Sequence, residues 1–174
     1  MKRFRFFLLL LPVIFLAETG QSQNYFMKIK GVEGESKKEF YKGWIELNSV
    51  TQTVTRSNAA TGSGRLMAGR ADFEDLTISK KIDRTSPMLM QKCASGDMID
   101  EVELELPSAD GSGSYKIKLS DVRISSVKSS SECKPRCEMM EEVSFNYSKI
   151  TWEYADKSGA PVKAGYDLKM NKKI

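Results

Sequence analysis

The sequence contains no histidine and only three cysteines among its 174 residues. Because histidine is the commonest general base and the commonest metal ligand, its absence argues against most hydrolytic and metal centres. Serine-rich stretches without histidine also provide no catalytic triad. The carboxylate pairs Glu74–Asp75 and Asp100–Glu101 lie in expected strands, where adjacent side chains point to opposite faces. We therefore expect no catalytic residue, no metal site and no cofactor, in a protein that is not an enzyme.

The three cysteines are Cys93, Cys133 and Cys137, and their number and spacing limit the metal and redox sites that they can form. Three residues separate Cys133 from Cys137, so the pair does not match the C-x-x-C redox motif, and a zinc site would need a fourth ligand. In an oxidising compartment two of the three can form a structural disulfide and leave one free thiol. The spacing does not decide which two pair, and Cys133 with Cys137 is the candidate disulfide.

A strong net charge is also missing. The formal net charge is +4 at pH 7. Residues 1–22 account for +2 of it through Lys2, Arg3, Arg5 and Glu18, which leaves +2 for the rest of the chain. Because the remaining basic residues do not cluster, we expect no binding to nucleic acid.

A single long apolar run occurs at the start of the chain, from Phe6 to Leu16, after a basic stretch. This arrangement is typical of a secretory signal peptide, and the run is shorter than the ~20 residues of a membrane-spanning helix. We expect residues 1–22 to be a signal peptide, residues 23–174 to form one domain, and the mature protein to be secreted or periplasmic. We expect no stable membrane span after cleavage.

The remaining sequence reads mostly as β-strands. In the segment 99–119, Val102, Leu104 and Leu106 alternate with glutamates, and Tyr115, Ile117 and Leu119 alternate with lysines. One register sets Leu106 opposite Tyr115 and also sets Glu105 opposite Lys116 and Glu103 opposite Lys118, which predicts an antiparallel hairpin. The apolar positions change parity between Phe73 and Leu76, between Leu119 and Val122, and between Tyr147 and Ile150. Such changes indicate bends, which favour a small antiparallel β-barrel over a flat sheet.

One short helix is predicted within residues 81–96. Ser86 can cap its start, Pro87 suits the first helical position, and Gly96 suits the residue after its end. Leu89 and Cys93 are expected to face inward, and Met88 and Met90 are assigned to core packing. The segments 56–70 and 125–138 are rich in small or polar residues and are predicted as exposed loops. The basic segment 159–174 is left without an assigned structure.

Several segments resemble the haemolysin-coregulated protein (Hcp) family of type VI secretion systems. They are YFMKIKGVEGES with the following GWIEL, the stretch GRLMAGRADFEDLTISKKIDRTSPMLMQKCASG, and EEVSFNYSKITWEYAD. The order and spacing of these segments cover about residues 25–155. The resemblance implies a β-barrel with one flanking helix, assembled with copies of itself into a hexameric ring. It further implies rings stacked into a tube, small effector proteins held in the lumen, a helix near the lumen wall, and no catalysis.

The resemblance also suggests a use for the segment 56–70, which in the family reaches toward neighbouring subunits. Arg65, Met67 and Arg70 are our candidates for these subunit contacts. Tube subunits of the family are normally made without a signal peptide, whereas this chain begins with one. The alternative function is therefore a stand-alone secreted or periplasmic binding module with the same barrel, monomeric, that uses loops 56–70 and 107–114.

Overall fold

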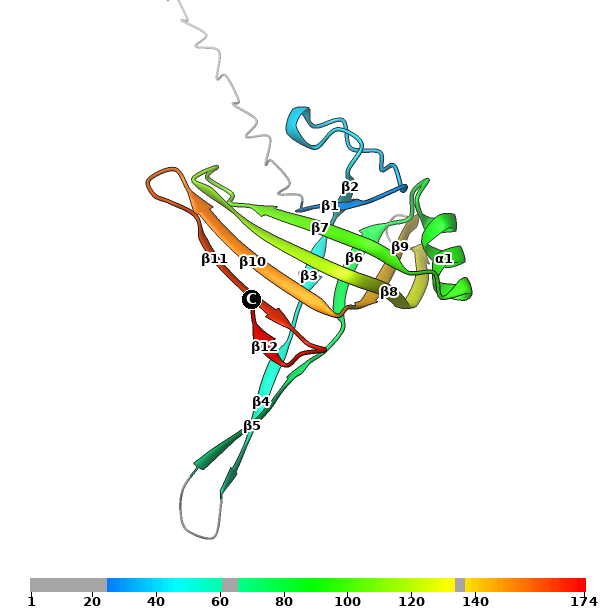
Figure 1. Ribbon diagram of the computed structural model, residues 1–174. Helices are drawn as coiled ribbons and strands as arrows, with labels where there is room; N and C mark the ends of the chain where they lie inside the picture. The colour runs from blue at the N-terminus through cyan, green and yellow to red at the C-terminus, as the bar shows by residue number, and fades with distance from the viewer. Residues whose placement is uncertain (1–24, 61–65, 134–136) are drawn as a thin grey trace, which may run out of the picture.

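The computed structural model describes residues 25–60, 66–133 and 137–174. Antiparallel strands dominate these residues, with one α-helix and one turn of 3-10 helix beside them (Figure 1). In chain order the elements are β1 (Tyr25–Ile29), η1 (Glu39–Tyr41), β2 (Ile45–Leu47), β3 (Ser49–Thr51), β4 (Val54–Ala60), β5 (Leu66–Phe73), β6 (Leu76–Lys81), α1 (Ser86–Ser95), β7 (Ile99–Pro107), β8 (Gly113–Cys133), β9 (Cys137–Asn146), β10 (Lys149–Asp156), β11 (Val162–Asp167) and β12 (Lys172–Lys173). The prediction of a mainly β fold with one short flanking helix is confirmed.

Two antiparallel sheets share the long strand β8 and enclose one core. The larger sheet has the order β12-β11-β10-β8-β7-β1-β2, and β3, β6 and β9 lead back to the outer half of β8. Asp121, with a φ of 52°, interrupts the alternation of side chains along β8. Ile117 and Leu119 before it, and Val122 and Ile124 after it, are all buried. The predicted change of buried face within this strand is therefore confirmed.

The other two predicted bends are wrong, because each is a gap between two separate strands. Phe73 ends β5 and Leu76 begins β6, while Asn146 ends β9 and Lys149 begins β10. In both places the chain leaves one ladder and joins another across a two-residue connection. The buried positions change between odd and even residue numbers there because a new strand begins after the connection, and not because of a bulge within one strand.

The two sheets do not close into the predicted barrel. β1 pairs with β2 and β6 pairs with β3, but among the described strands no ladder joins β2 to β6. Asn48 separates the two short strands, and its N–H donates to the carbonyl of Ser79 at 2.7 Å. The chain passes from one sheet to the other at Asn48, so the sheets wrap one core without a continuous ring of ladders.

The predicted hairpin of β7 and β8 is confirmed in its register. The facing residues are Leu106 and Tyr115, Glu105 and Lys116, Leu104 and Ile117, Glu103 and Lys118, and Val102 and Leu119. Lys116 lies 3.4 Å from Glu105, whereas Lys118 lies 2.6 Å from its diagonal neighbour Glu101. These half-exposed ion pairs add little stability. The buried alternate residues hold the hairpin in place.

The core is built from both sheets and from one side chain of α1. Its buried members are Met27, Ile29, Val32, Ile45, Leu47, Leu76, Ile78, Leu89, Ile99, Val102, Leu104, Ile117, Leu119, Val122, Ile124, Val143, Phe145, Tyr147 and Ile150. Leu89 is the contribution of α1, and Cys93 packs half-buried beside the core. The assignment of Met88 and Met90 to the core is wrong, because both are exposed. Residues on either side of Leu89 are rotated by about 100° around the helix.

The helix begins one residue away from its predicted cap. Thr85 occupies the N-cap position and Ser86 is the first helical residue, with Pro87 following in the first turn. The hydroxyl of Ser86 is used elsewhere, because it donates to Glu141 at 2.8 Å and accepts from the N–H of Asp83 at 3.0 Å. Gly96 ends the helix at a φ of 69°, as predicted.

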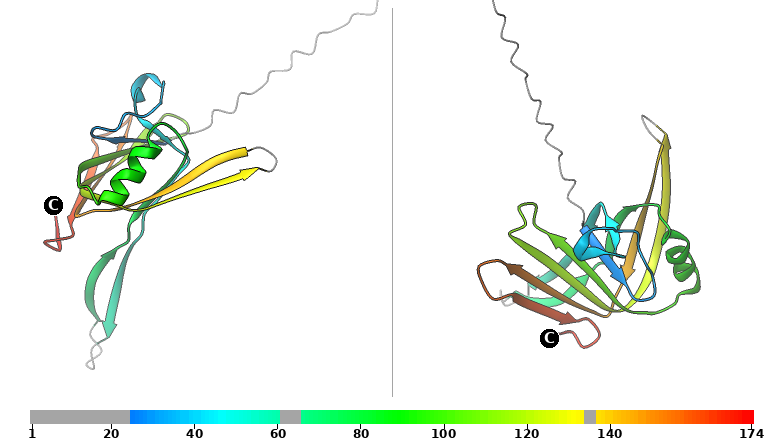
Figure 2. Two further views of the ribbon diagram at one scale, coloured as in Figure 1. Left: turned by 90° about the vertical axis from the view of Figure 1, so that its right-hand side faces the viewer. Right: turned by 90° about the horizontal axis from the view of Figure 1, so that it is seen from above.

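Two hairpins project from the body, and the sequence predicted both as loops. β4 and β5 pair only with each other among the described strands and form a separate two-stranded sheet (Figure 1). The outer parts of β8 and β9 pair as far as Cys133 and Cys137 (Figure 2). The prediction of irregular loops is wrong for the described residues 56–60, 66–70, 125–133 and 137–138, because they belong to strands that pair across each hairpin.

The C-terminal segment also forms strands. β11 pairs with β10 along its length, and β12 pairs with β11 at the edge of the larger sheet. Nothing in the described parts of the chain is a helix with the length and apolar character that a bilayer crossing needs.

Candidate functional site

Two of the three residues predicted for subunit contacts, Met67 and Arg70, lie on β5. Arg65 lies outside the described residues. Met67 belongs to β5, where its backbone faces Ala59. Arg70 lies near the base of the hairpin, is exposed, and donates from Nη2 to the carbonyl of Leu168 at 3.1 Å. Arg70 therefore contacts its own chain, and a role between subunits stays a prediction.

An aromatic cluster joins the base of the β4–β5 hairpin to the larger sheet. The ring of Phe73, the last residue of β5, lies 5.1 Å from the ring of Tyr166 and 6.4 Å from that of Trp152. All three side chains are half-buried and pack against the core. Because such ring pairs have preferred geometries, this cluster sets the direction in which the hairpin leaves the body. Sequence reasoning missed the cluster, since nothing in the pattern shows that β5 and β11 meet.

Gln52, between β3 and β4, adds a polar contact to the aromatic cluster. Its Oε1 accepts a hydrogen bond from the indole Nε1 of Trp152 at 3.0 Å. Its Nε2 is buried without a hydrogen-bond partner among the described residues. The hydroxyl of Tyr147 donates to the carbonyl of Glu74, the residue after Phe73, at 3.3 Å. These two hydrogen bonds connect the body to Gln52, before the hairpin, and to Glu74, after it.

Beside this cluster is a cavity of about 400 Å³, which we call the stem pocket. Its lining residues are Arg70, Ala71, Asp72, Phe73, Tyr166, Leu168 and Asn171. The rings of Phe73 and Tyr166 supply aromatic surface, and Asn171 accepts a hydrogen bond from the hydroxyl of Tyr166 at 2.8 Å. Arg70 and Asp72 are exposed and place both signs of charge among the lining residues. The pocket suits an apolar or aromatic group with polar neighbours.

At the other end of the sheets, residues 33–44 form a projecting loop, which we call the η1 loop. The ring of Tyr41 stacks on Phe26 of β1 with centroids 3.8 Å apart, and Trp44 meets Tyr41 edge-on at 5.5 Å. Burial, and next the neighbouring Glu105 carboxylate, raises the pKa of Tyr41 to about 12. Phe40, in the same 3-10 turn, is 86% exposed.

A buried charge cluster fixes the start of α1 to the second sheet. The ammonium of Lys80, which is fully buried, lies 2.8 Å from Asp83 and 2.8 Å from Glu141. It also donates to the carbonyl of Lys81 at 2.8 Å. Burial alone raises the pKa of Asp83, but hydrogen bonds from Lys80 and Thr85 outweigh it and hold that pKa below its ordinary value. These charges are paired within the chain, so the cluster is structural.

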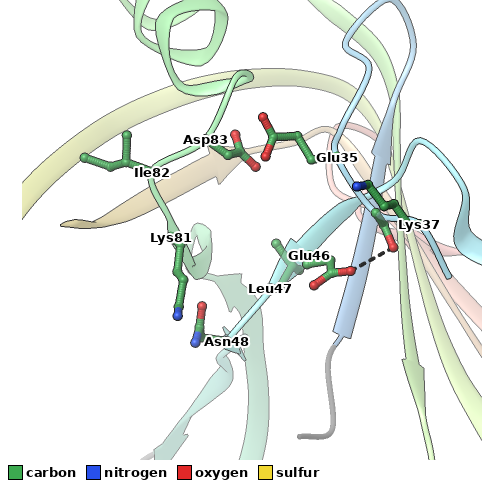
Figure 3. A pocket seen from close by; sticks show the side chains of 9 residues that line it. Glu35, Lys37, Glu46, Leu47, Asn48, Lys81, Ile82 and Asp83 are labelled. Atoms are coloured by element: carbon green, nitrogen blue, oxygen red, sulfur yellow. Dashed lines mark hydrogen bonds between the residues drawn. The ribbon is translucent and has the colours of Figure 1, made fainter. Parts of the chain in front are cut away.

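A second cavity, of about 600 Å³, lies between the η1 loop, β2 and the chain leading to α1 (Figure 3). Ser36 donates to Glu46 at 2.9 Å across its wall, and Glu35 accepts from the N–H of Arg84 at 3.2 Å. Asp83 is engaged by Lys80. Among the described residues no group of three or more cysteines, aspartates or glutamates is arranged to hold a metal ion. The carboxylates of this cavity therefore brace the loop against the body.

Three of the four carboxylates singled out in the sequence have partners of their own. Asp75 accepts hydrogen bonds from Ser125 at 2.5 Å and from Asn146 at 2.9 Å. Asp100 lies 3.7 Å from Lys30, and Glu101 lies 2.6 Å from Lys118. The structure brings neither pair together as an acid and a base.

The cysteines fall in two places. Cys133 and Cys137 are facing residues at the end of the β8–β9 hairpin, with Cα atoms 3.9 Å apart and their sulfurs joined. Cys93 is free and half-buried on α1. The arrangement is compatible with the candidate pairing, which stays a prediction for the protein in solution.

Comparison with known proteins identifies the fold. The family model described as type VI secretion system effector, Hcp, matches residues 26–154. The chain is 30% identical over 157 residues to protein hcp1 of Pseudomonas aeruginosa strain PAO1, covering 85% of this chain and 96% of that protein. It is similar to the crystal structure of Hcp1 from Salmonella typhimurium, with 28% identity, a TM-score of 0.73, and coverage of 87% and 98%. A solved type six secretion system protein matches with 26% identity, a TM-score of 0.79, and coverage of 87% and 99%.

Proposed function

The chain belongs to the Hcp family of type VI secretion system effectors, and from this premise we propose that it is a structural subunit that forms rings. The ring is built from copies of this chain, with six copies as the expected number. Rings of this kind can stack into a tube whose lumen holds small effector proteins. The family resemblance supports each of these statements.

The observation that carries the proposal is the β4–β5 hairpin. Among the described strands it pairs only with itself, and it extends well beyond the sheets (Figure 1). A two-stranded hairpin is marginally stable in water on its own. Contact with another copy would satisfy its open edges and stabilise it, which supports the hairpin as the lateral contact of the ring. Arg65, Met67 and Arg70 stay the candidate contact residues on it.

The same premise supports a role without catalysis. The matched family is a structural one, and Asp75, Asp100 and Glu101 each contact a partner within the chain. No cofactor, metal or nucleic acid enters the proposed assembly. Its partners are further copies of the chain and the effectors in the lumen.

Export is the second part of the proposal. Residues 1–22, the expected signal peptide, lie outside the described residues, and the single domain of residues 23–174 would follow its cleavage. We expect the mature protein to be secreted or periplasmic, where a Cys133–Cys137 disulfide is stable. The alternative function, a monomeric binding module of the same fold, predicts one copy in solution.

Removal of the outer hairpin tests the proposal. In the test variant an Asn-Gly turn replaces residues 58–68, of which residues 58–60 pair with residues 66–68 across the ladder. We expect the ring mass to fall to the monomer mass in size-exclusion chromatography with light scattering. The melting temperature of the body should change little, since Phe73 and its aromatic contacts remain. An unchanged ring mass would show that the hairpin is not the lateral contact.

A further inference from the structure

We propose that Phe40 of one copy docks into the stem pocket of the next copy, so that copies contact end to end through the η1 loop. This inference rests on the proposed self-assembly and names a second, separate contact within it. The chemistry is an aromatic side chain entering a pocket with aromatic walls. The occupant is a second copy of this chain.

Phe40 has the character of an interface anchor. With 86% of its surface exposed, it is the most exposed large apolar side chain among the described residues. Lys38 and Glu39 precede it, and Lys42 follows the 3-10 turn. An aromatic residue within a polar rim is the usual composition of an interface hot spot.

The loop holds Phe40 in place before any partner arrives. Below it, the stacked rings of Tyr41 and Phe26 and the edge contact with Trp44 form a rigid support. The backbone is closed by hydrogen bonds from Gly34 N–H to the Gly43 carbonyl at 2.8 Å and from Gly43 N–H to the Ser36 carbonyl at 2.9 Å. A side chain at Gly34 would collide with the Trp44 carbonyl. A preorganised anchor loses little entropy on binding.

The stem pocket matches this anchor. Its cavity of about 400 Å³ is large enough for a phenyl ring and lies against Phe73, Tyr166 and Leu168. Arg70 and Asp72 at its rim complement Glu39 and the lysines beside Phe40. Met170, in the turn between β11 and β12 that also carries part of the pocket lining, is a further exposed apolar residue. Arg70 is thus available to pair with Glu39 of the other copy, and Asp72 with one of its lysines.

The two surfaces lie at opposite ends of the molecule. The η1 loop projects above the sheets in Figure 1, while the β4–β5 hairpin leaves the sheets at the bottom, and the left view of Figure 2 keeps this arrangement. Residues 70–73 of the pocket lining belong to β5 of this hairpin. A contact between opposite ends joins copies head to tail and repeats along one axis.

The variant Phe40→Ala tests the contact, with Val162→Ala as a matched control that removes another exposed apolar side chain. Sedimentation velocity would measure association above the size of a single ring. We expect Phe40→Ala to weaken this association by roughly thirtyfold or more, as for truncation of a buried aromatic anchor, and to leave the ring mass unchanged. Val162→Ala should match the parent protein. Equal association of all three proteins would overturn the inference.

A photo-crosslinking amino acid at position 40 gives an independent readout. We expect crosslinks to peptides that contain residues 70–73 or 166–171 of another copy, identified by mass spectrometry. Crosslinks elsewhere, or none, would refute the docking site. The two proposals fail in different ways, because loss of the lateral contact abolishes the ring, whereas loss of the Phe40 contact abolishes only the association of rings.

Discussion

Lys80 is a fully buried charged residue that pairs with two carboxylates next to the N-terminus of α1. Its ammonium lies 2.8 Å from both Asp83 and Glu141, and Glu141 Oε2 is buried without a hydrogen-bond partner among the described residues. Once buried, each of these charges depends on the others, because an unpaired charge in the interior is costly. The alternation of β6 places Lys80 on the same face as Leu76 and Ile78 and Lys81 on the opposite face. The sequence does not show the two carboxylates that pair with a lysine at this inward position.

Replacement of the buried lysine should therefore be far more damaging than replacement of its neighbour. Lys80→Met leaves Glu141 and Asp83 without their cation, and we expect it to lower the free energy of unfolding by ~3–5 kcal/mol. Lys81→Met is the control, because that side chain is mostly exposed and lies 3.8 Å from Glu138. The control should change the free energy by less than about half a kcal/mol. Urea denaturation measures both, and equal midpoints would contradict the burial of Lys80.

Among the elements, the hairpin of β7 and β8 was predictable to the residue, and the other two hairpins were not. In β7–β8, apolar and charged residues alternate on both strands, so only one register satisfies both faces. The sequence of segments 56–70 and 125–138 lacks the regular alternation of apolar residues that indicates a buried face. Ser129, Ser130 and Ser131 are exposed, and the strands form because each arm pairs with its own partner. A pattern search for buried alternation does not detect such strands.

The aromatic cluster at the hairpin base could not be predicted from the sequence either. Its contribution to stability can be tested by mutation. Trp152 is half-buried, packs on Phe73 and donates to Gln52 at 3.0 Å. We expect Trp152→Ala to lower the free energy of unfolding by roughly 2–3 kcal/mol, less than the ~3–5 kcal/mol of a fully buried aromatic residue. Trp152→Phe keeps the ring contact and should recover most of the loss. Thermal unfolding that is unchanged in Trp152→Ala would show that the cluster does not hold the hairpin.

At the scale of the whole molecule, the body has two unlike ends. The η1 loop projects from one end and the β4–β5 hairpin from the other (Figure 1). Phe40 belongs to the η1 loop, and Arg70 and Phe73 of the stem pocket belong to β5. The segments that resemble the Hcp family already implied a β-rich fold with a flanking helix, and the family assignment confirms that resemblance. The sequence could not show that the barrel stays open. This depends on Asn48, where the chain passes from β2 in one sheet to β3 in the other.

The central claim is that this chain works as a subunit of a ring made of its own copies. Negative-stain electron microscopy of the purified mature protein, at concentrations of tens of micromolar, tests it most directly. We predict closed rings of uniform size, some of them stacked. Fields of single, separate particles of monomer size would contradict the claim and favour the monomeric binding module.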